Sequence, residues 1–327
     1  MFYYTNKRRR NKKLLLIAAL AALAVVLIIL IILSADTIAG WFGSKSKAPE
    51  ATGTTPTAVA TPEPTPQKPL EEAGLTVLDR FGVPDGFKRI SVERDSFGEF
   101  LRNYPLKPYG TVPKFKNGND CDTAPTMGVL EQTIISDNQT SPRAAMFLYA
   151  SYLFEKGAYD AISFDFFTTP VFHFDYTTWL TGQRVNTAVN PPEWYTPEEA
   201  TPAEPTRENF ERYMKFAMAY ANTHSLKAQL NTASYANLKV GDVMLEYNHA
   251  ILVLDICQNE QTGEVRFICA ENKNIVENVG GKDKLIVSEM YLLQDAETQS
   301  VWLTLEEDGT FVYDDKVYGA NCVRRFE

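Results

Sequence analysis

The longest apolar stretch of the chain lies near its N-terminus. Residues Leu14 to Leu33 run without a polar side chain. As an α-helix these 20 residues would extend about 30 Å, the thickness of the hydrocarbon core of a bilayer. A cleavable signal peptide has a shorter apolar region, of roughly 7 to 15 residues, and a small-x-small exit, whereas SADTIAGWFG follows here. The pattern therefore predicts an uncleaved transmembrane helix over 14–33.

The charges that flank this run predict its orientation. Residues 1–13 contain no acid and six cations: Lys7, Arg8, Arg9, Arg10, Lys12 and Lys13. Because cytoplasmic flanks are enriched in lysine and arginine, segment 1–13 is expected in the cytoplasm and the remainder of the chain outside. We expect a single-pass protein of the cell membrane, anchored by 14–33, with an extracytoplasmic C-terminal part.

Two further segments follow the predicted anchor. Residues 34–74 are dominated by Pro, Thr and Ala, as in TPEPTPQKP, and are expected to form an extended linker. Residues 75–327 have ordinary apolar content and enough length for one folded domain. Without the six cytoplasmic cations, 26 cations remain against 41 acids, a net charge of −15. This acidity excludes nucleic acid as an expected partner.

Within 75–327, helical patterns come before strand patterns. Ser96 and Glu99 have capping-box spacing ahead of a helix over 97–103. A second helix is predicted in SPRAAMFLYASYLFEKG, with Ser141 as N-cap, and a third near 207–221. The predicted strands are the alternating segment 162–166 and then DVMLEY, HAILVLDIC, EVRFICAE, KLIVSEMYLL and SVWLTL. The fold class expected is α+β, with helices packed on an antiparallel sheet. The Pro/Glu-rich insertion 190–206 is expected to be a mobile flap or a variable loop.

The hairpin after His249 allows a register to be calculated. A three-residue loop over 261–263 would place His249 opposite Ile275 and diagonal to Glu277, which could orient the histidine ring. In the same register Cys257 and Cys269 are diagonal neighbours, about 7 to 8 Å apart, so two free thiols are expected. Asp255 lies on the same face as His249 but roughly 20 Å along the strand, which is too far for a hydrogen bond.

Five segments of the domain occur in an order typical of a known family. They are SFGEFLRNYPLKP, YLFEKGAYDAISF, WLTGQR, KVGDVMLEYNHAILVLD and ICAEN. Together they resemble the bacterial domain-of-unknown-function family 4846, which has no assigned reaction. The GDV…HA phrase is also similar to the histidine strand of papain-like cell-wall amidases and peptidases, so the resemblance implies a papain-like fold. Family members typically have a cysteine near the start of the helix where this chain has Ser141 or Pro142.

His249 is the candidate general base, and three residues are candidate nucleophiles. Ser141 also has a structural role as the predicted N-cap. Cys121 stands between two aspartates, which would raise its pKa. Cys322 follows the histidine in the chain, an order found in circularly permuted papain-like hydrolases, and the neighbouring arginines would favour its thiolate.

Other polar groups point to binding. Trp179 and Arg184 belong to the WLTGQR segment of the family resemblance and could line a groove for glycan or peptide. The alternative is that Trp179 is a core residue beside a turn. His173 and Asp175 give only two potential ligands, so no metal site is expected. Glycine-rich phosphate loops are absent from the sequence, and no cofactor is expected.

Three functions remain open from the sequence. The domain could bind wall-derived peptide or glycan without catalysis, or it could hydrolyse an amide bond through His249. It could instead be a structural or protein-interaction module at the cell surface. The first is favoured because the cysteine of the resembled family is missing. Peptidoglycan or envelope proteins are the expected partners, besides the membrane through 14–33.

Overall fold

The computed structural model describes residues 70–326. These residues belong to one compact unit of the chain. The predicted cytoplasmic segment 1–13, the predicted membrane helix 14–33 and most of the linker 34–74 lie outside them. Among residues 70–326, no helix is both long and apolar enough to span a bilayer.

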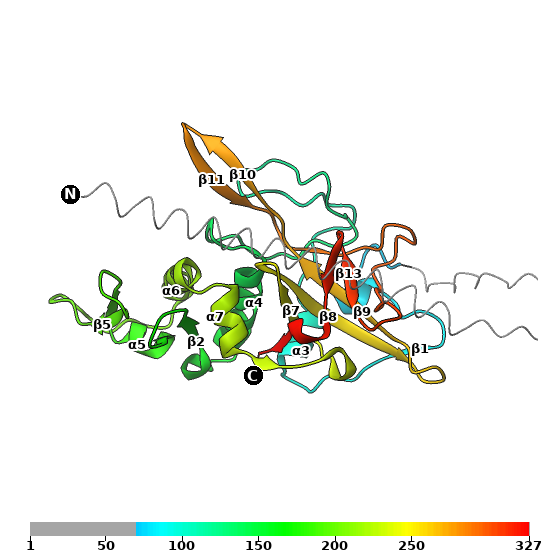
Figure 1. Ribbon diagram of the computed structural model, residues 1–327, viewed down its shortest axis with the longest axis horizontal. Coiled ribbons are helices and arrows are strands. Elements are labelled where there is room, and N and C mark those ends of the chain that lie inside the picture. The colour runs from blue at the N-terminus through cyan, green and yellow to red at the C-terminus, as the bar shows by residue number, and fades with distance from the viewer. Residues whose placement is uncertain (1–69, 327) are drawn as a thin grey trace, which may run out of the picture. The chain divides into compact units, whose positions relative to one another are not determined.

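An antiparallel sheet of seven strands forms the centre of the described unit (Figure 1). The strand order is β12 (Tyr291–Leu292), β9 (Val265–Glu271), β8 (His249–Asn259), β7 (Asp242–Glu246), β15 (Val323–Arg325) and β6 (Asn231–Thr232). The seventh strand, β1 (Phe87–Arg89), pairs with the far end of β8. The longest strand is β8, whose burial is almost continuous because both faces of the sheet are covered.

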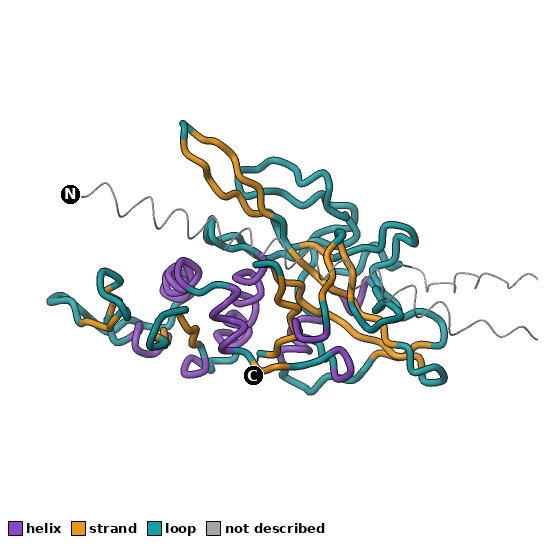
Figure 2. Tube along the Cα trace, in the orientation of Figure 1, coloured by secondary structure: helices purple, strands orange, loops and turns teal. Residues whose placement is uncertain are grey.

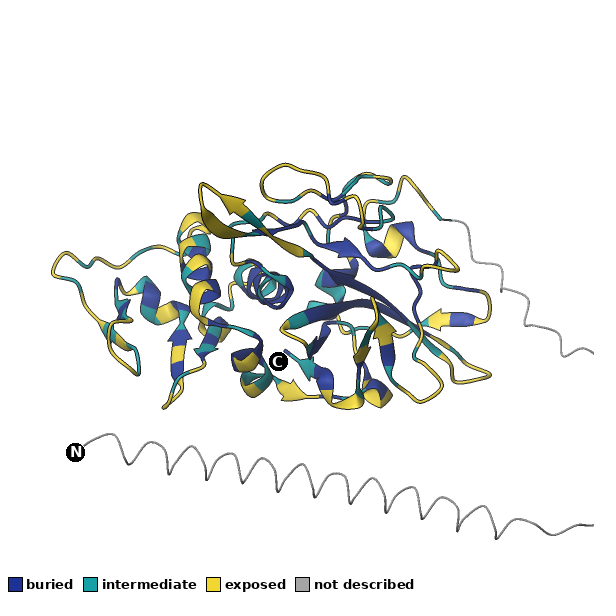
Figure 3. Cartoon of the chain, turned by 45° about the horizontal axis from the view of Figure 1, so that its top comes forward, coloured by how far each residue is buried: buried dark blue, intermediate teal, exposed yellow. Residues whose placement is uncertain are grey.

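Helix α4 (Ser141–Glu155) packs against one face of this sheet. Eleven of its residues are buried, among them Ala144 and Leu148, and they share a core with Ala250, Leu252 and Leu254 of the β8 region. Figure 1 shows α4 between the sheet and helix α6 (Arg207–Tyr220), and Figure 3 shows how few of its residues are exposed. The remaining α-helices of residues 70–326 are α2 (Val77–Arg80), α3 (Phe97–Arg102), α5 (Tyr176–Leu180) and α7 (Thr223–Gln229).

The opposite face of the sheet has its own core. Ile251, Val253 and Cys269 lie there, covered in part by the hairpin β13 (Phe311–Tyr313) and β14 (Lys316–Tyr318). Three more two-stranded sheets complete the described unit (Figure 2). They are β2 (Ser163–Phe166) with β3 (Phe172–Asp175), β4 (Arg184–Asn186) with β5 (Glu193–Tyr195), and β10 (Asn274–Val279) with β11 (Lys282–Val287).

The three predicted helices are found as α3, α4 and α6, four of the six predicted strands are found as β2, β7, β8 and β9, and the α+β class is confirmed. Helices α2, α5 and α7 were not predicted. Three details differ. The apolar segment predicted as one strand over 284–293 is divided between β11 and β12. The segment 300–305 forms only an isolated bridge, between Leu303 and Phe267. The insertion 190–206 contains β5, and its Trp194 stacks on Phe174 at 5.3 Å, so this part is packed against the domain.

The predicted register of the β8–β9 hairpin is wrong. The Asn259 amide donates to the Glu264 carbonyl, so the loop has four residues, 260–263. A bulge between Val253 and Asp255 then shifts the pairing again. Cys257 and Cys269 consequently lie in cores on opposite faces of the sheet. All four cysteines are free and buried, as expected for the two hairpin thiols.

Asp255 is the centre of a buried ion-pair cluster. Its carboxylate is fully buried and receives the Nε–H groups of Arg89 at 2.6 Å and Arg102 at 2.7 Å. Such a charge is tolerated in a core only when it is paired and hydrogen-bonded. The cluster joins β8 to β1 and α3. Its Asp255 carboxylate is hydrogen-bonded to these arginines and not to His249, as the sequence predicts.

Candidate active site

Ser141 is the first residue of α4, and the predicted N-cap role is wrong. The cap is Thr140, whose backbone is extended (φ −63°, ψ 167°), and Pro142 follows inside the first turn. The Ser141 hydroxyl is therefore not used to cap the helix. It points to strand β8, where the Ala250 amide donates a hydrogen bond to Oγ at 3.0 Å.

A tight turn places His249 beside this hydroxyl. Tyr247 (φ 51°) and Asn248 (φ 57°) both adopt left-handed conformations, as a two-residue type I′ hairpin requires, and join Glu246 to its partner His249. The ring consequently stands at the first position of β8, next to the start of α4. Its Nδ1 lies 2.8 Å from Ser141 Oγ.

The second ring nitrogen of His249 meets Glu271 at the end of β9. Nε2 lies 2.6 Å from Glu271 Oε2, and the Tyr291 hydroxyl donates to Oε1 at 2.9 Å. Because the Glu271 carboxylate can only accept, the proton of the neutral ring resides on Nε2 and is donated to it. Nδ1 is then the acceptor for the Ser141 hydroxyl, whose oxygen also accepts from the Ala250 amide. Serine, base and orienting carboxylate thus form one hydrogen-bonded series.

The series is largely shielded from solvent. Ser141 is 1% exposed and Glu271 4%, whereas the His249 side chain is 18% exposed. Burial and the nearby Glu271 carboxylate raise the pKa of Tyr291, so its phenol remains a donor at neutral pH. His249 is thus the most exposed of the three residues. A substrate would reach the Ser141 Oγ atom only after the residues that cover this atom move.

The turn before His249 contacts the β13–β14 hairpin. Tyr247 is 58% exposed, donates to the Val317 carbonyl at 3.1 Å and meets the Tyr318 ring edge-on. The hydrogen bond from Lys316 is the main cause of the lowered pKa of Asp314, and His249 contributes to it. The β13–β14 hairpin therefore contacts the turn that precedes His249 and brings the Asp314 carboxylate within electrostatic reach of the ring.

Asn272 ties the segments that carry Ser141 and Glu271 together. Its Nδ2 donates to the Gln139 carbonyl at 2.8 Å and to the Ser288 carbonyl at 3.2 Å. Its Oδ1 is buried without a hydrogen-bond partner in the described part of the chain. Asn272 therefore connects the end of β9 to the loop before α4.

Glu277, the orienting residue predicted from the sequence, lies elsewhere. It is on β10 in the projecting hairpin, where both its carboxylate oxygens accept from Asn117 Nδ2, at 3.0 and 3.1 Å. The reason is the register: continued at the observed spacing, the β8–β9 ladder would put His249 opposite Lys273, with Glu271 and Ile275 as its diagonal neighbours, and Glu277 lies beyond them on β10. The ICAEN segment of the family resemblance contains Glu271 and Asn272, and that was the available signal.

The predicted thiol candidates do not join the site. Cys322 is 1% exposed and shares a hydrogen bond with the Tyr235 hydroxyl at 3.3 Å. Its pKa is raised, chiefly by burial. The neighbouring Arg325 is engaged by Asp242 at 2.7 Å. Burial, more than its two aspartate neighbours, also raises the pKa of Cys121. Neither thiol is activated as a nucleophile.

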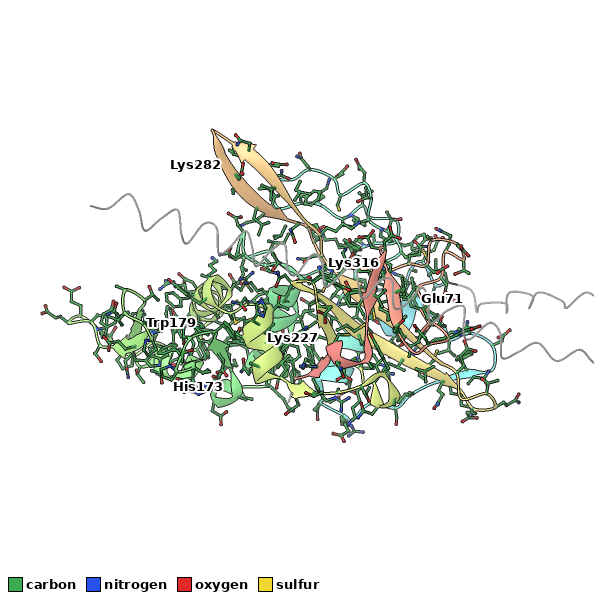
Figure 4. The ribbon with its side chains drawn as sticks, in the orientation of Figure 1. Glu71, His173, Trp179, Lys227, Lys282 and Lys316 are labelled. Atoms are coloured by element: carbon green, nitrogen blue, oxygen red, sulfur yellow. The ribbon has the colours of Figure 1, made fainter. Side chains whose placement is uncertain are left out.

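Trp179 and Arg184 pair with each other in a different part of the domain. The guanidinium lies 4.1 Å from the centroid of the Trp179 ring, which is 7% exposed, and donates to the Trp179 carbonyl. Figure 4 shows Trp179 well away from Lys316, which belongs to the hairpin beside His249. The pair forms part of the packing around α5.

His173 also has a partner other than the one considered from the sequence. Its Nδ1 lies 2.6 Å from Asp165, while Asp175 caps α5 by accepting from the Thr178 amide. Within residues 70–326, no group of three or more His, Cys, Asp or Glu side chains is arranged to hold a metal ion.

With this geometry established, comparison with known proteins places the chain in a family. Residues 77–283 match the model of the family described as "Domain of unknown function (4846)". The chain belongs to this family, as the ordered sequence motifs indicate. No curated protein matches the chain, and no solved structure does.

Proposed function

We propose that the domain is a serine-dependent hydrolase of amide bonds, with Ser141 as nucleophile, His249 as general base and Glu271 as the residue that orients the histidine. The observation that carries the proposal is the hydrogen-bonded series from Ser141 through His249 to Glu271. A nucleophile, a base within reach and a third group on the base together define this chemistry.

The reaction would proceed by acyl transfer. His249 Nδ1 accepts the hydroxyl proton as Ser141 Oγ attacks the carbonyl carbon, and the proton then passes to the leaving amine as the C–N bond breaks. Water, deprotonated by the same nitrogen, hydrolyses the ester and restores the serine. The Ser141 amide is the first of α4, at the end where a helix presents N–H groups without intrahelical acceptors, whereas Pro142 has no N–H and the Arg143 amide donates to the Thr140 carbonyl. The positive end of the helix dipole would stabilise the oxyanion there.

The order of these residues supports a papain-like topology. The nucleophile opens a helix, the base stands on a later strand, and the orienting group is on the neighbouring strand. Together with the membrane anchor predicted at 14–33, this favours wall-derived peptides as substrates and the outer face of the cell membrane as the site of action.

A second function is favoured by one observation. Ser141 is 1% exposed and its Oγ already accepts the Ala250 amide, as expected if the three residues only fix α4 to β8. The domain would then bind envelope material without catalysis.

Labelling with a small fluorophosphonate tests the catalytic proposal on the full-length chain in detergent. We expect stoichiometric modification, located at Ser141 by mass spectrometry and lost in Ser141→Ala and His249→Ala. Ser151→Ala is the matched control, because Ser151 lies on the same helix and is 4% exposed. A folded native chain that stays unlabelled would exclude the hydrolase and leave the binding function.

Co-sedimentation with purified peptidoglycan tests the setting. Both the hydrolase and the binding module should sediment with wall fragments. A protein-interaction module at the cell surface should remain in the supernatant.

A further inference from the structure

A pocket of about 510 Å³ lies at the end of α4 opposite to Ser141. It is formed between the segment 95–105, which includes α3, and the last turn of α4. The helix has 15 residues, so the pocket is about 20 Å from the serine. It is separate from the candidate active site.

Aromatic rings form much of the pocket wall. Phe100 lies 5.4 Å from Tyr104 and 5.7 Å from Tyr152, measured between ring centroids, and all three rings line the pocket. They are half-buried, so part of each remains accessible. Such a wall offers apolar contact and the negative faces of aromatic rings.

Charged side chains at the rim give the pocket a negative character. Asp95, Glu99 and Glu155 line it together with one cation, Lys156. The net charge of these four groups is −2, and the C-terminal end of α4 adds the negative end of its dipole. Arg207, a cation near Tyr104, is paired with Glu211 at 3.1 Å. Anionic ligands are therefore disfavoured.

Lys156 shows how an ammonium group is held here. Its Nζ lies 5.2 Å from the centroid of the Tyr152 ring and donates to the Asp95 carbonyl at 2.9 Å and to the Tyr152 hydroxyl at 3.0 Å. Asp95 has a left-handed backbone (φ 56°), and its carbonyl also accepts from the Tyr152 hydroxyl, at 2.8 Å. A ring face and oxygen acceptors together are the chemistry that recognises ammonium groups.

We propose that this pocket is a binding site for a primary ammonium group on an aliphatic chain, such as the lysine side chain of a peptide. The alkyl chain packs on Phe100 and Tyr104, and the ammonium group is held by the Glu99 and Glu155 carboxylates. Lys156 occupies one position of this kind and opposes the entry of a second cation by charge repulsion. The site does not depend on the proposed chemistry at Ser141.

Ligand-observed NMR titration of the full-length chain in detergent tests the proposal. The probe is Nα-acetyl-lysine amide, and its Nε-acetylated form is the matched neutral ligand. We expect millimolar affinity for the charged probe and at least threefold weaker binding of the neutral one, with the difference reduced at high salt. Equal binding of the two ligands, or no binding of the charged probe, would overturn the proposal.

Two variants give opposite expected results. Glu155→Gln should weaken binding of the charged probe about two- to fivefold, because it removes one exposed carboxylate. Lys156→Gln should strengthen binding of the same probe by a similar factor, because a competing cation is lost. If Lys156→Gln weakens binding instead, the lysine itself recognises the ligand, and the pocket binds something other than a cation. Glu297→Gln, on an exposed loop away from the pocket, is the control.

Discussion

Ser141 Oγ and His249 Nδ1 lie 2.8 Å apart although 108 residues separate them along the chain. The contact exists because α4 starts at Ser141 and β8 starts at His249, and these two starting points meet where the helix packs on the sheet. The only special local structure that this contact requires is the tight turn before His249.

Ser141→Cys should create a reactive thiol. The four native cysteines are buried, and burial raises the pKa of each, so the folded native chain should be alkylated slowly by iodoacetamide. A thiol beside His249 should react about tenfold faster or more at pH 7. Mass spectrometry of the time course measures the rate.

Ser151→Cys is the control for this experiment, since it puts a thiol into the same helix away from His249. Similar slow rates in both variants would show that His249 does not activate position 141.

Glu271→Gln should disturb His249, whereas Glu277→Gln should not. The amide cannot accept the Nε2 proton with the strength of a carboxylate, so the ring loses its fixed tautomer. Fluorophosphonate labelling at Ser141 should slow by a factor on the order of 10². The downfield proton resonance of His249 Nε2–H should also shift or disappear, and this signal does not require any catalytic activity.

The Glu277 variant distinguishes the two glutamates directly. Its side chain is half-buried and contacts Asn117, so a loss of the His249 signal in Glu277→Gln would contradict the contacts of the two glutamates.

Asp255→Asn should destabilise the domain strongly. It leaves the guanidinium groups of Arg89 and Arg102 without their buried partner, and breaking such a pair costs about 3 to 5 kcal/mol. Glu260→Gln removes the ion pair between Glu260 and Lys88 of β1, which is exposed to solvent. This substitution should cost less than about 1 kcal/mol of the free energy of unfolding. Urea unfolding of the two variants measures the difference, and equal midpoints would be inconsistent with a buried cluster.

Alkaline pH should destabilise the fold before its buried groups ionise. Burial raises the pKa of Tyr176 and of Cys257 to about 12, and it raises the pKa of Tyr213 well above 10. The unfolded chain loses these protons from about pH 9 to 10, so between there and pH 12 it binds fewer protons than the native state. The free energy of unfolding should therefore be steady up to about pH 8 and then fall.

Urea unfolding at pH 8, 9, 10 and 11 measures this dependence. Absorbance at 295 nm should show most of the buried tyrosines ionising together with unfolding. A free energy of unfolding that stays constant to pH 11 would contradict the raised pKa values.

Glu277, which was predicted beside His249, and Glu271, which is found there, show where sequence reasoning reaches its limit. Side-chain orientation in a strand alternates residue by residue, so a small error in register changes which residue faces a given partner. The four-residue loop and the bulge near Asp255 shift the position opposite His249 from Ile275 to Lys273, so that Glu271, and not Glu277, is a diagonal neighbour. Neither feature has a strong local sequence signal.

The sequence by itself determined the local elements of this protein. Hydrophobic periods, the Ser96 cap and the turn residues placed α3, α4, α6 and most of the sheet strands, because these signals act over a few neighbouring residues. They also identified His249 and Ser141 as candidates. Only the tertiary structure decided that Thr140 caps α4, that Ser141 meets His249, and that Glu271 and Tyr291 complete the series. Those contacts join residues far apart in the chain, and their geometry depends on the packing of α4 on the sheet and on a register that local patterns do not specify.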